Sequence, residues 1–132
     1  MPPNAPANIG REGILKWSRG FLAPLRIRFA RFLIKVNIPV EAGNAAVKAG
    51  KLGATIQSIL ASLKPEAVYF TDDNGQKTAF IFLEMQDASQ IPSIVEPWFL
   101  ALNASIAIHP VMVPDDLGKA GSAFEEAVNK YG

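Results

Sequence analysis

The sequence contains no cysteine and a single histidine, His109. The absence of cysteine excludes disulfides, thiolate zinc sites and a cysteine nucleophile, and it is typical of a cytoplasmic protein. One histidine cannot form a multi-histidine metal site. The acidic pairs Asp72-Asp73 and Asp115-Asp116 leave a carboxylate magnesium site open, although acids are also common at turns and helix starts for backbone reasons. We therefore expect no metal and no other cofactor.

Long apolar runs and nucleotide-binding motifs are also missing. No apolar run approaches the roughly 20 residues of a membrane-spanning helix. Gly43, Gly50 and Gly53 lack the Lys-Ser/Thr ending of a phosphate-binding loop, and no Gly-x-Ser-x-Gly elbow occurs. The aromatic segment 77–82 is vaguely similar to the strand of RNA-recognition domains, but it lacks their glycine after the basic residue. We expect no nucleic-acid partner.

The net charge of +1 conceals a marked asymmetry along the chain. Residues 1–35 carry seven basic side chains and one acidic one, whereas residues 36–132 carry six lysines and eleven acids. We expect a disordered or partly helical basic extension over residues 1–28, followed by one folded domain over residues 29–132. An Arg-rich segment that contains Trp17 is also compatible with association at a membrane surface. An extension outside the fold is the interpretation we favour.

The most informative segment is the predicted strand 78–85. Side chains alternate across a strand, so Ala79, Ile81 and Leu83 face one side and the other side receives Phe80, Phe82 and Glu84. Both faces are therefore apolar, whereas an antiparallel sheet in a small monomer usually leaves one face in water. This strand needs two covers, and we expect the second cover to be another copy of the chain.

Periodicity and turn signals predict a complete set of elements. Asn74-Gly75 predicts a hairpin, Pro97 predicts a kink or break in its helix, and Ser122 with Glu125 predicts a capping box. The order predicts an α+β protein with a ferredoxin-like βαββαβ fold, a C-terminal helix and a four-stranded antiparallel sheet, which pairs into a dimeric α+β barrel. The predicted strands are 29–38, 66–71, 78–85 and 104–113, and the predicted helices are 41–63, whose first half could also be a loop or a separate turn, 88–103 and a last helix from 122.

Five stretches from Arg31 onward carry a resemblance to known proteins. They are VNIPVEAGN at 36–44, KPEAVYF at 64–70, DASQIP at 87–92, EPWF at 96–99 and HPVM at 109–112. In these stretches the chain resembles a family of small ferredoxin-like bacterial proteins of unknown function, and it is similar to the wider α+β barrel superfamily. The resemblance implies a space between two sheets that holds a small organic molecule.

The candidate site residues follow from the predicted sheet. Glu84 shares a face with Phe80 and Phe82, so a covering partner would place it in an apolar setting as a general acid or base. The alternative is a position at the sheet rim, in water or paired with Lys35. His109 is a candidate base and Tyr69 a candidate hydrogen-bond donor, although we favour a structural role for His109 and a packing role for Tyr69. The candidate ligand-binding residues are Lys35, Asn37, Phe80 and Phe82.

We therefore expect a small homodimer that binds a small, largely apolar molecule or serves as an assembly module, without catalysis of its own. The first alternative is a cofactor-independent isomerase or monooxygenase that uses Glu84 or His109 as base and Tyr69 as hydrogen-bond donor. The second alternative is membrane-surface association through the basic N-terminal segment.

Overall fold

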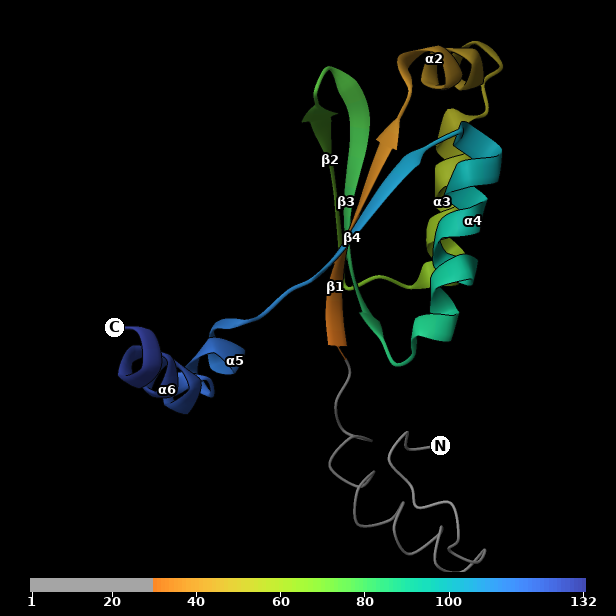
Figure 1. Cartoon of the computed structure of the whole chain (residues 1–132). Coiled ribbons are helices and arrows are strands. Elements are labelled where there is room, and N and C mark those ends of the chain that lie inside the picture. The colour runs from red at the N-terminus through yellow and green to blue at the C-terminus, as the bar shows by residue number, and fades with distance from the viewer. Residues whose placement is uncertain (1–29) are drawn as a thin grey trace, which may run out of the picture. The chain divides into compact units, whose positions relative to one another are not determined.

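The computed structural model describes residues 30–132, which form an α+β domain with a four-stranded antiparallel sheet (Figure 1). The predicted α+β class is thus confirmed, and the expectations for residues 1–28 lie outside the described part of the chain. The strand order across the sheet is β2-β3-β1-β4. The elements in chain order are β1 (Ala30–Ile38), α2 (Val40–Lys48), α3 (Leu52–Leu63), β2 (Ala67–Asp73), β3 (Gln76–Met85), the 3-10 turn η2 (Ala88–Gln90), α4 (Ile91–Leu102), β4 (Ser105–Pro110), α5 (Pro114–Gly118) and α6 (Gly121–Tyr131).

Helices α3 and α4 lie side by side on one face of the sheet (Figure 1). The core lies between them and the sheet, and its largest fully buried side chains are those of Trp98, Ile34, Ile81 and Val36. The predicted alternation of β3 is confirmed, because Ala79, Ile81 and Leu83 are buried whereas the residues between them are not. One face of the sheet is therefore covered by helices. We call the other face the open face.

The predicted helix over residues 41–63 is two helices. Gly50 separates them with a φ of +68°, a left-handed conformation that glycine adopts at little cost. The first half is thus a separate helix, α2, and the apolar stripe of the second half packs on the core from α3. The hairpin prediction is confirmed, since Asn74 and Gly75 both have positive φ and join β2 to β3.

The predicted break at Pro97 and the predicted capping box of Ser122 with Glu125 are both absent from the structure. Helix α4 continues through Pro97, because the ring removes only one backbone donor and the buried stripe on both sides of it holds the helix against the sheet. Helix α6 begins at Gly121 after Ala120 without a side-chain cap, so Ser122 and Glu125 do not form a capping box. Strand β4 ends at Pro110 on an edge of the sheet, where a proline is tolerated.

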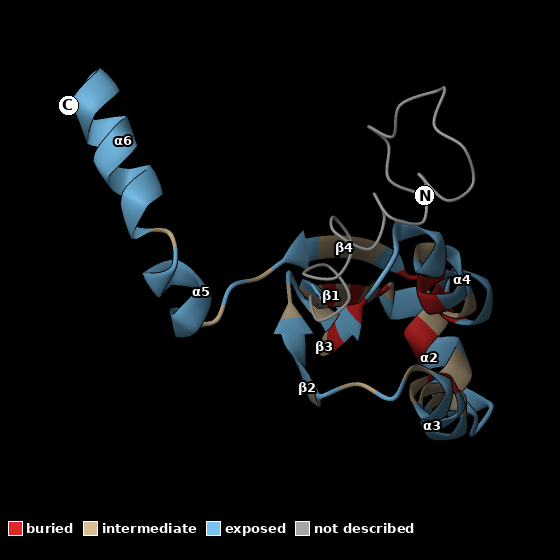
Figure 2. Ribbon diagram, turned by 90° about the horizontal axis from the view of Figure 1, so that it is seen from below, coloured by how far each residue is buried: buried red, intermediate tan, exposed pale blue. Residues whose placement is uncertain are grey.

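The C-terminal helix α6 differs from the other long helices in its burial. None of its residues is buried (Figure 2), and its apolar residues Phe124, Val128 and Tyr131 are between 56% and 85% exposed. None of the helices within residues 30–132 combines the length and apolar character needed to cross a bilayer.

Candidate functional site

All seven residues predicted for a site lie on strand positions that face the open side of the sheet. On β1, Lys35 and Asn37 alternate with the buried Ile34 and Val36. On β3, the three candidates alternate with buried residues in the same way, and they are Phe80, Phe82 and Glu84. Tyr69 of β2 lies opposite Phe80, and His109 of β4 lies opposite Leu33. The open face thus combines the candidates Lys35, Asn37, Tyr69, Phe80, Phe82, Glu84 and His109.

The open face carries an aromatic patch on β2 and β3, made of Tyr69, Phe80 and Phe82. Tyr69 is the direct cross-strand neighbour of Phe80, and its ring meets that of Phe82 edge to face, with centroids 6.4 Å apart and an interplanar angle of 78°. This geometry suits the quadrupoles of the two rings. Tyr69 nevertheless remains 63% exposed. Phe80 and Phe82 are half-buried, so the patch presents a partly exposed aromatic surface.

A polar cluster bounds one end of the open face. Lys35 forms an ion pair with Asp73, and Asn37 Nδ2 donates hydrogen bonds to Thr78 Oγ1 at 2.8 Å and to Asp73 Oδ2 at 3.4 Å. Hydrogen bonding from the Lys35 ammonium, assisted by Asn37, lowers the pKa of Asp73 below its ordinary value of 3.8. The predicted ligand-binding residues Lys35 and Asn37 thus both contact Asp73 and belong to one structural network.

A second charged cluster lies on the same face around Arg31. Arg31 Nε donates to both carboxylate oxygens of Glu66 at 3.0 Å, and Arg31 Nη2 lies 3.8 Å from Glu84 Oε1. Hydrogen bonding and charge attraction from Glu66 raise the pKa of Arg31. The side chain of Glu84 is 46% exposed. In the single chain Glu84 is thus about half exposed and paired with Arg31, whereas Lys35 is paired with Asp73.

The structure does not assemble Glu84, His109 and Tyr69 into a catalytic set. Among the described residues, no hydrogen bond joins any two of them, and His109 is exposed on the edge strand. No group of three His, Asp or Glu side chains within residues 30–132 is placed to hold a metal ion. The open face therefore presents an aromatic surface with charged groups at its margins.

Three residues that contact the predicted candidates were not predicted from the sequence, namely Arg31, Glu66 and Thr78, and Asp73 was considered only for a metal site. Arg31 and Glu66 are 35 residues apart, and Asn37 and Thr78 are 41 apart, so no local spacing links them. Residue spacing could not have found these contacts, because they depend on the order and register of the strands.

No family model, curated protein or solved structure matches this chain. The resemblance to small ferredoxin-like bacterial proteins therefore remains a prediction. The geometry of the open face is what supports a function.

Proposed function

We propose that the protein is a self-associating module in which the open face of one copy packs on the open face of a second. The observation that carries this proposal is the partly exposed aromatic patch on β2 and β3 of that face. Interfaces between proteins typically have an apolar, aromatic-rich centre and a polar rim. The open face has a similar organisation along its strands, because the aromatic patch lies between the ion pair of Lys35 and the ion pair of Arg31.

The proposal includes a specific arrangement of the two copies. The strand order is β2-β3-β1-β4, with helices on one face of the sheet. We propose that this is a ferredoxin-like arrangement, in which two interlocked β-α-β units share one sheet. Two such sheets related by a twofold axis can meet with identical surfaces, which is the commonest symmetry of protein dimers. The result is a dimeric α+β barrel, with space between the sheets for a small, largely apolar molecule.

The experiment that tests self-association is the molar mass in solution, measured by light scattering at micromolar concentration. The full chain and a chain beginning at Arg28 are both expected to have the mass of a dimer. Phe82→Glu places a charge in the aromatic patch and is expected to give a monomer. Leu100→Glu makes a similar change at a site on α4 that is 81% exposed, and it is expected to leave the dimer intact.

The other outcomes of this measurement contradict the proposal. Monomers from both wild-type chains would leave the aromatic patch without a partner copy. A monomer from the full chain with a dimer from the shortened chain would assign the cover to residues 1–27. A dimer that tolerates Phe82→Glu would move the interface to another surface.

A second candidate function is a cofactor-independent isomerase or monooxygenase, supported by the shared face of Glu84, His109 and Tyr69. This candidate requires the dimer to withdraw His109 from water. Because His109 is the sole histidine, its modification by diethyl pyrocarbonate can be followed at one site. Slower modification in the wild type than in Phe82→Glu would support this candidate, whereas equal rates would eliminate it.

A further inference from the structure

A cavity of about 290 Å³ lies on the helix-covered side of the sheet, beside the β2–β3 hairpin. Its volume is at the lower end of the range of roughly 300–1,000 Å³ that small-molecule sites occupy. It differs in position from the open face, because Phe70 lies opposite the buried Ala79 and Ile38 continues the buried series of Ile34 and Val36. The lining residues are Ile38, Leu52, Ile56, Phe70, Thr71, Lys77 and Thr78.

The walls of this cavity are mainly apolar. Ile38 is only 3% exposed, and Leu52 and Ile56 of α3 are partly buried against the core. Phe70 is different, since it is 57% exposed although its strand position faces the helix side of the sheet. Its edge strand has no further neighbour to cover the ring. An apolar ligand in the cavity would therefore remove surface of Phe70 from water.

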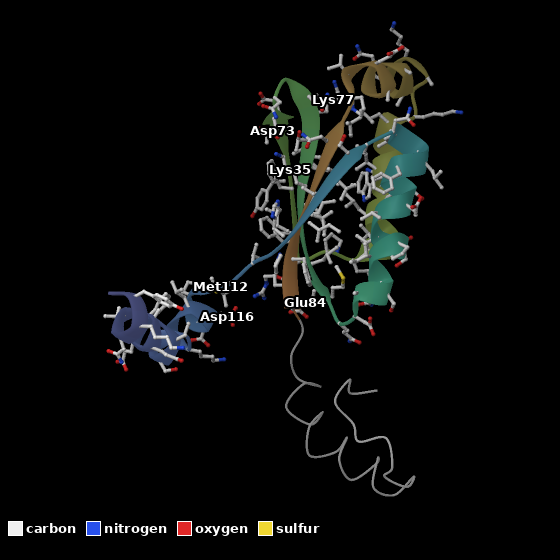
Figure 3. The ribbon with its side chains drawn as sticks, viewed as in Figure 1. Lys35, Asp73, Lys77, Glu84, Met112 and Asp116 are labelled. Carbon is white, nitrogen blue, oxygen red and sulfur yellow. The ribbon has the colours of Figure 1, made fainter. Side chains whose placement is uncertain are left out.

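The cavity has one charged lining residue, Lys77. Its stem passes over the buried Gly43 of α2, where the Cβ of a larger residue would lie 3.6 Å from Lys77 Cδ and 3.4 Å from Ile38 Cγ2. Both distances are those of ordinary van der Waals contacts, so the stem of Lys77 packs beside Gly43 and Ile38 at the edge of the cavity. No carboxylate within residues 30–132 lies within ion-pair distance of Lys77, although Asp72 is its cross-strand neighbour. Figure 3 shows Lys77 at the end of the sheet next to α2.

The remaining buried polar group of the lining is already satisfied. Thr78 is 2% exposed, and its hydroxyl accepts a hydrogen bond from Asn37 and donates one to the carbonyl oxygen of Gln76. The hydroxyl of Thr71, also in the lining, donates to Asp72 Oδ1 at 3.5 Å, which leaves the ammonium of Lys77 as the one charged group for polar recognition in this cavity. An ammonium group is a point charge with three donors, which suits a carboxylate.

We propose that this cavity binds a small monocarboxylic acid, with its apolar body between Phe70 and α3 and its carboxylate on Lys77. The apolar walls favour the body of such a ligand, and the ammonium favours its anionic head. A neutral alcohol of the same length would keep the apolar contacts and lose the charge-assisted hydrogen bond, which is stronger than a hydrogen bond between neutral groups. This inference does not depend on the proposed self-association.

The experiment is a titration of the full chain with hexanoate, 1-hexanol and acetate, followed by the amide signals in two-dimensional NMR spectra. Hexanoate is expected to shift the signals of Leu52, Ile56, Phe70 and Lys77. It is also expected to bind at least about tenfold more tightly than 1-hexanol, because 1.4 kcal/mol corresponds to a factor of ten. Acetate is expected to leave these signals in place, because it lacks an apolar body.

Variants of Lys77 separate charge recognition from general apolar binding. Lys77→Met is expected to reduce hexanoate affinity to that of 1-hexanol, and Lys77→Arg is expected to keep the preference for the acid. Lys48→Met removes an exposed lysine of α2 that does not line the cavity, and it is expected to match the wild type. The proposal is overturned if hexanoate shifts none of these signals, shifts only open-face residues such as Tyr69 and Phe82, or keeps its preference in Lys77→Met.

Discussion

Lys35 of β1 forms an ion pair with Asp73 of β2 across the strand that separates them. The intervening strand is β3, which contributes Thr78 as the acceptor of a hydrogen bond from Asn37. Figure 3 shows Lys35 and Asp73 on neighbouring parts of the sheet. Three strands are thus tied together by side chains on the open face, beside the aromatic patch. These contacts hold the side chains of β1, β2 and β3 in a fixed arrangement on the open face.

The ion pair predicts a pH dependence of stability. Because the pKa of Asp73 is lowered in the folded chain, its charged form stabilises the fold at pH values above the ordinary pKa of 3.8. This contribution is expected to disappear as the pH falls from about 4 through the lower folded pKa. Asp73→Asn should therefore lose less stability than the wild type over that interval. Urea unfolding between pH 5 and pH 2.5 measures the difference.

Asp72→Asn is the matched control for this prediction. It removes the same charge from the neighbouring residue, which forms no ion pair among the described residues. Its acid dependence is expected to follow that of the wild type. Identical curves for Asp73→Asn and the wild type would show that the ion pair makes no measurable contribution in solution.

Two glycines predict opposite effects of the same substitution. Gly75 has a φ of +73° in the hairpin, so Gly75→Ala is expected to destabilise the fold by about 1 kcal/mol. Gly53 lies in α3 with no heavy atom within 4 Å of a Cβ at that position, so Gly53→Ala is expected to stabilise the fold by about 0.4–1 kcal/mol. Chemical unfolding of both variants measures the signs, and equal signs would contradict the turn geometry.

The alternation of side chains between the two faces of a strand, its parity, was the part of the structure most open to prediction from sequence. The alternation of strand 78–85 correctly separated the buried Ala79, Ile81 and Leu83 from the open-face residues. Parity has a period of two and is decided by neighbouring residues, so it needs no knowledge of the sheet order. The hairpin at Asn74-Gly75 was equally predictable because its conformation depends on two adjacent residues.

The polar partners could not be predicted because they depend on the strand order. The sequence left Glu84 either in water or paired with Lys35, whereas the order β2-β3-β1-β4 brings Arg31 to Glu84 and Lys35 to Asp73. Helix ends were also uncertain, because a capping pattern such as Ser122 with Glu125 is a local preference. In the structure, α6 begins one residue before Ser122 and makes no use of it as a cap.

The C-terminal helix yields the last prediction, which rests on the proposed self-association. Helix α6 has 11 residues and none of them is buried, and isolated helices shorter than about 12–15 residues are marginal in water. We therefore expect its apolar stripe to pack on the second copy. Val128→Asp is expected to weaken the dimer by about tenfold or more, since burying a valine contributes roughly 1.5–3 kcal/mol.

Asn129→Asp is the matched control, because it adds the same charge next to the apolar stripe instead of within it. Sedimentation equilibrium of both variants gives their dimer dissociation constants. A tenfold weakening confined to Val128→Asp would place α6 in the interface, because only that variant puts a charge among Phe124, Val128 and Tyr131. Equal dissociation constants for the two variants would place α6 outside the interface, and the dimer would then depend on the aromatic patch alone.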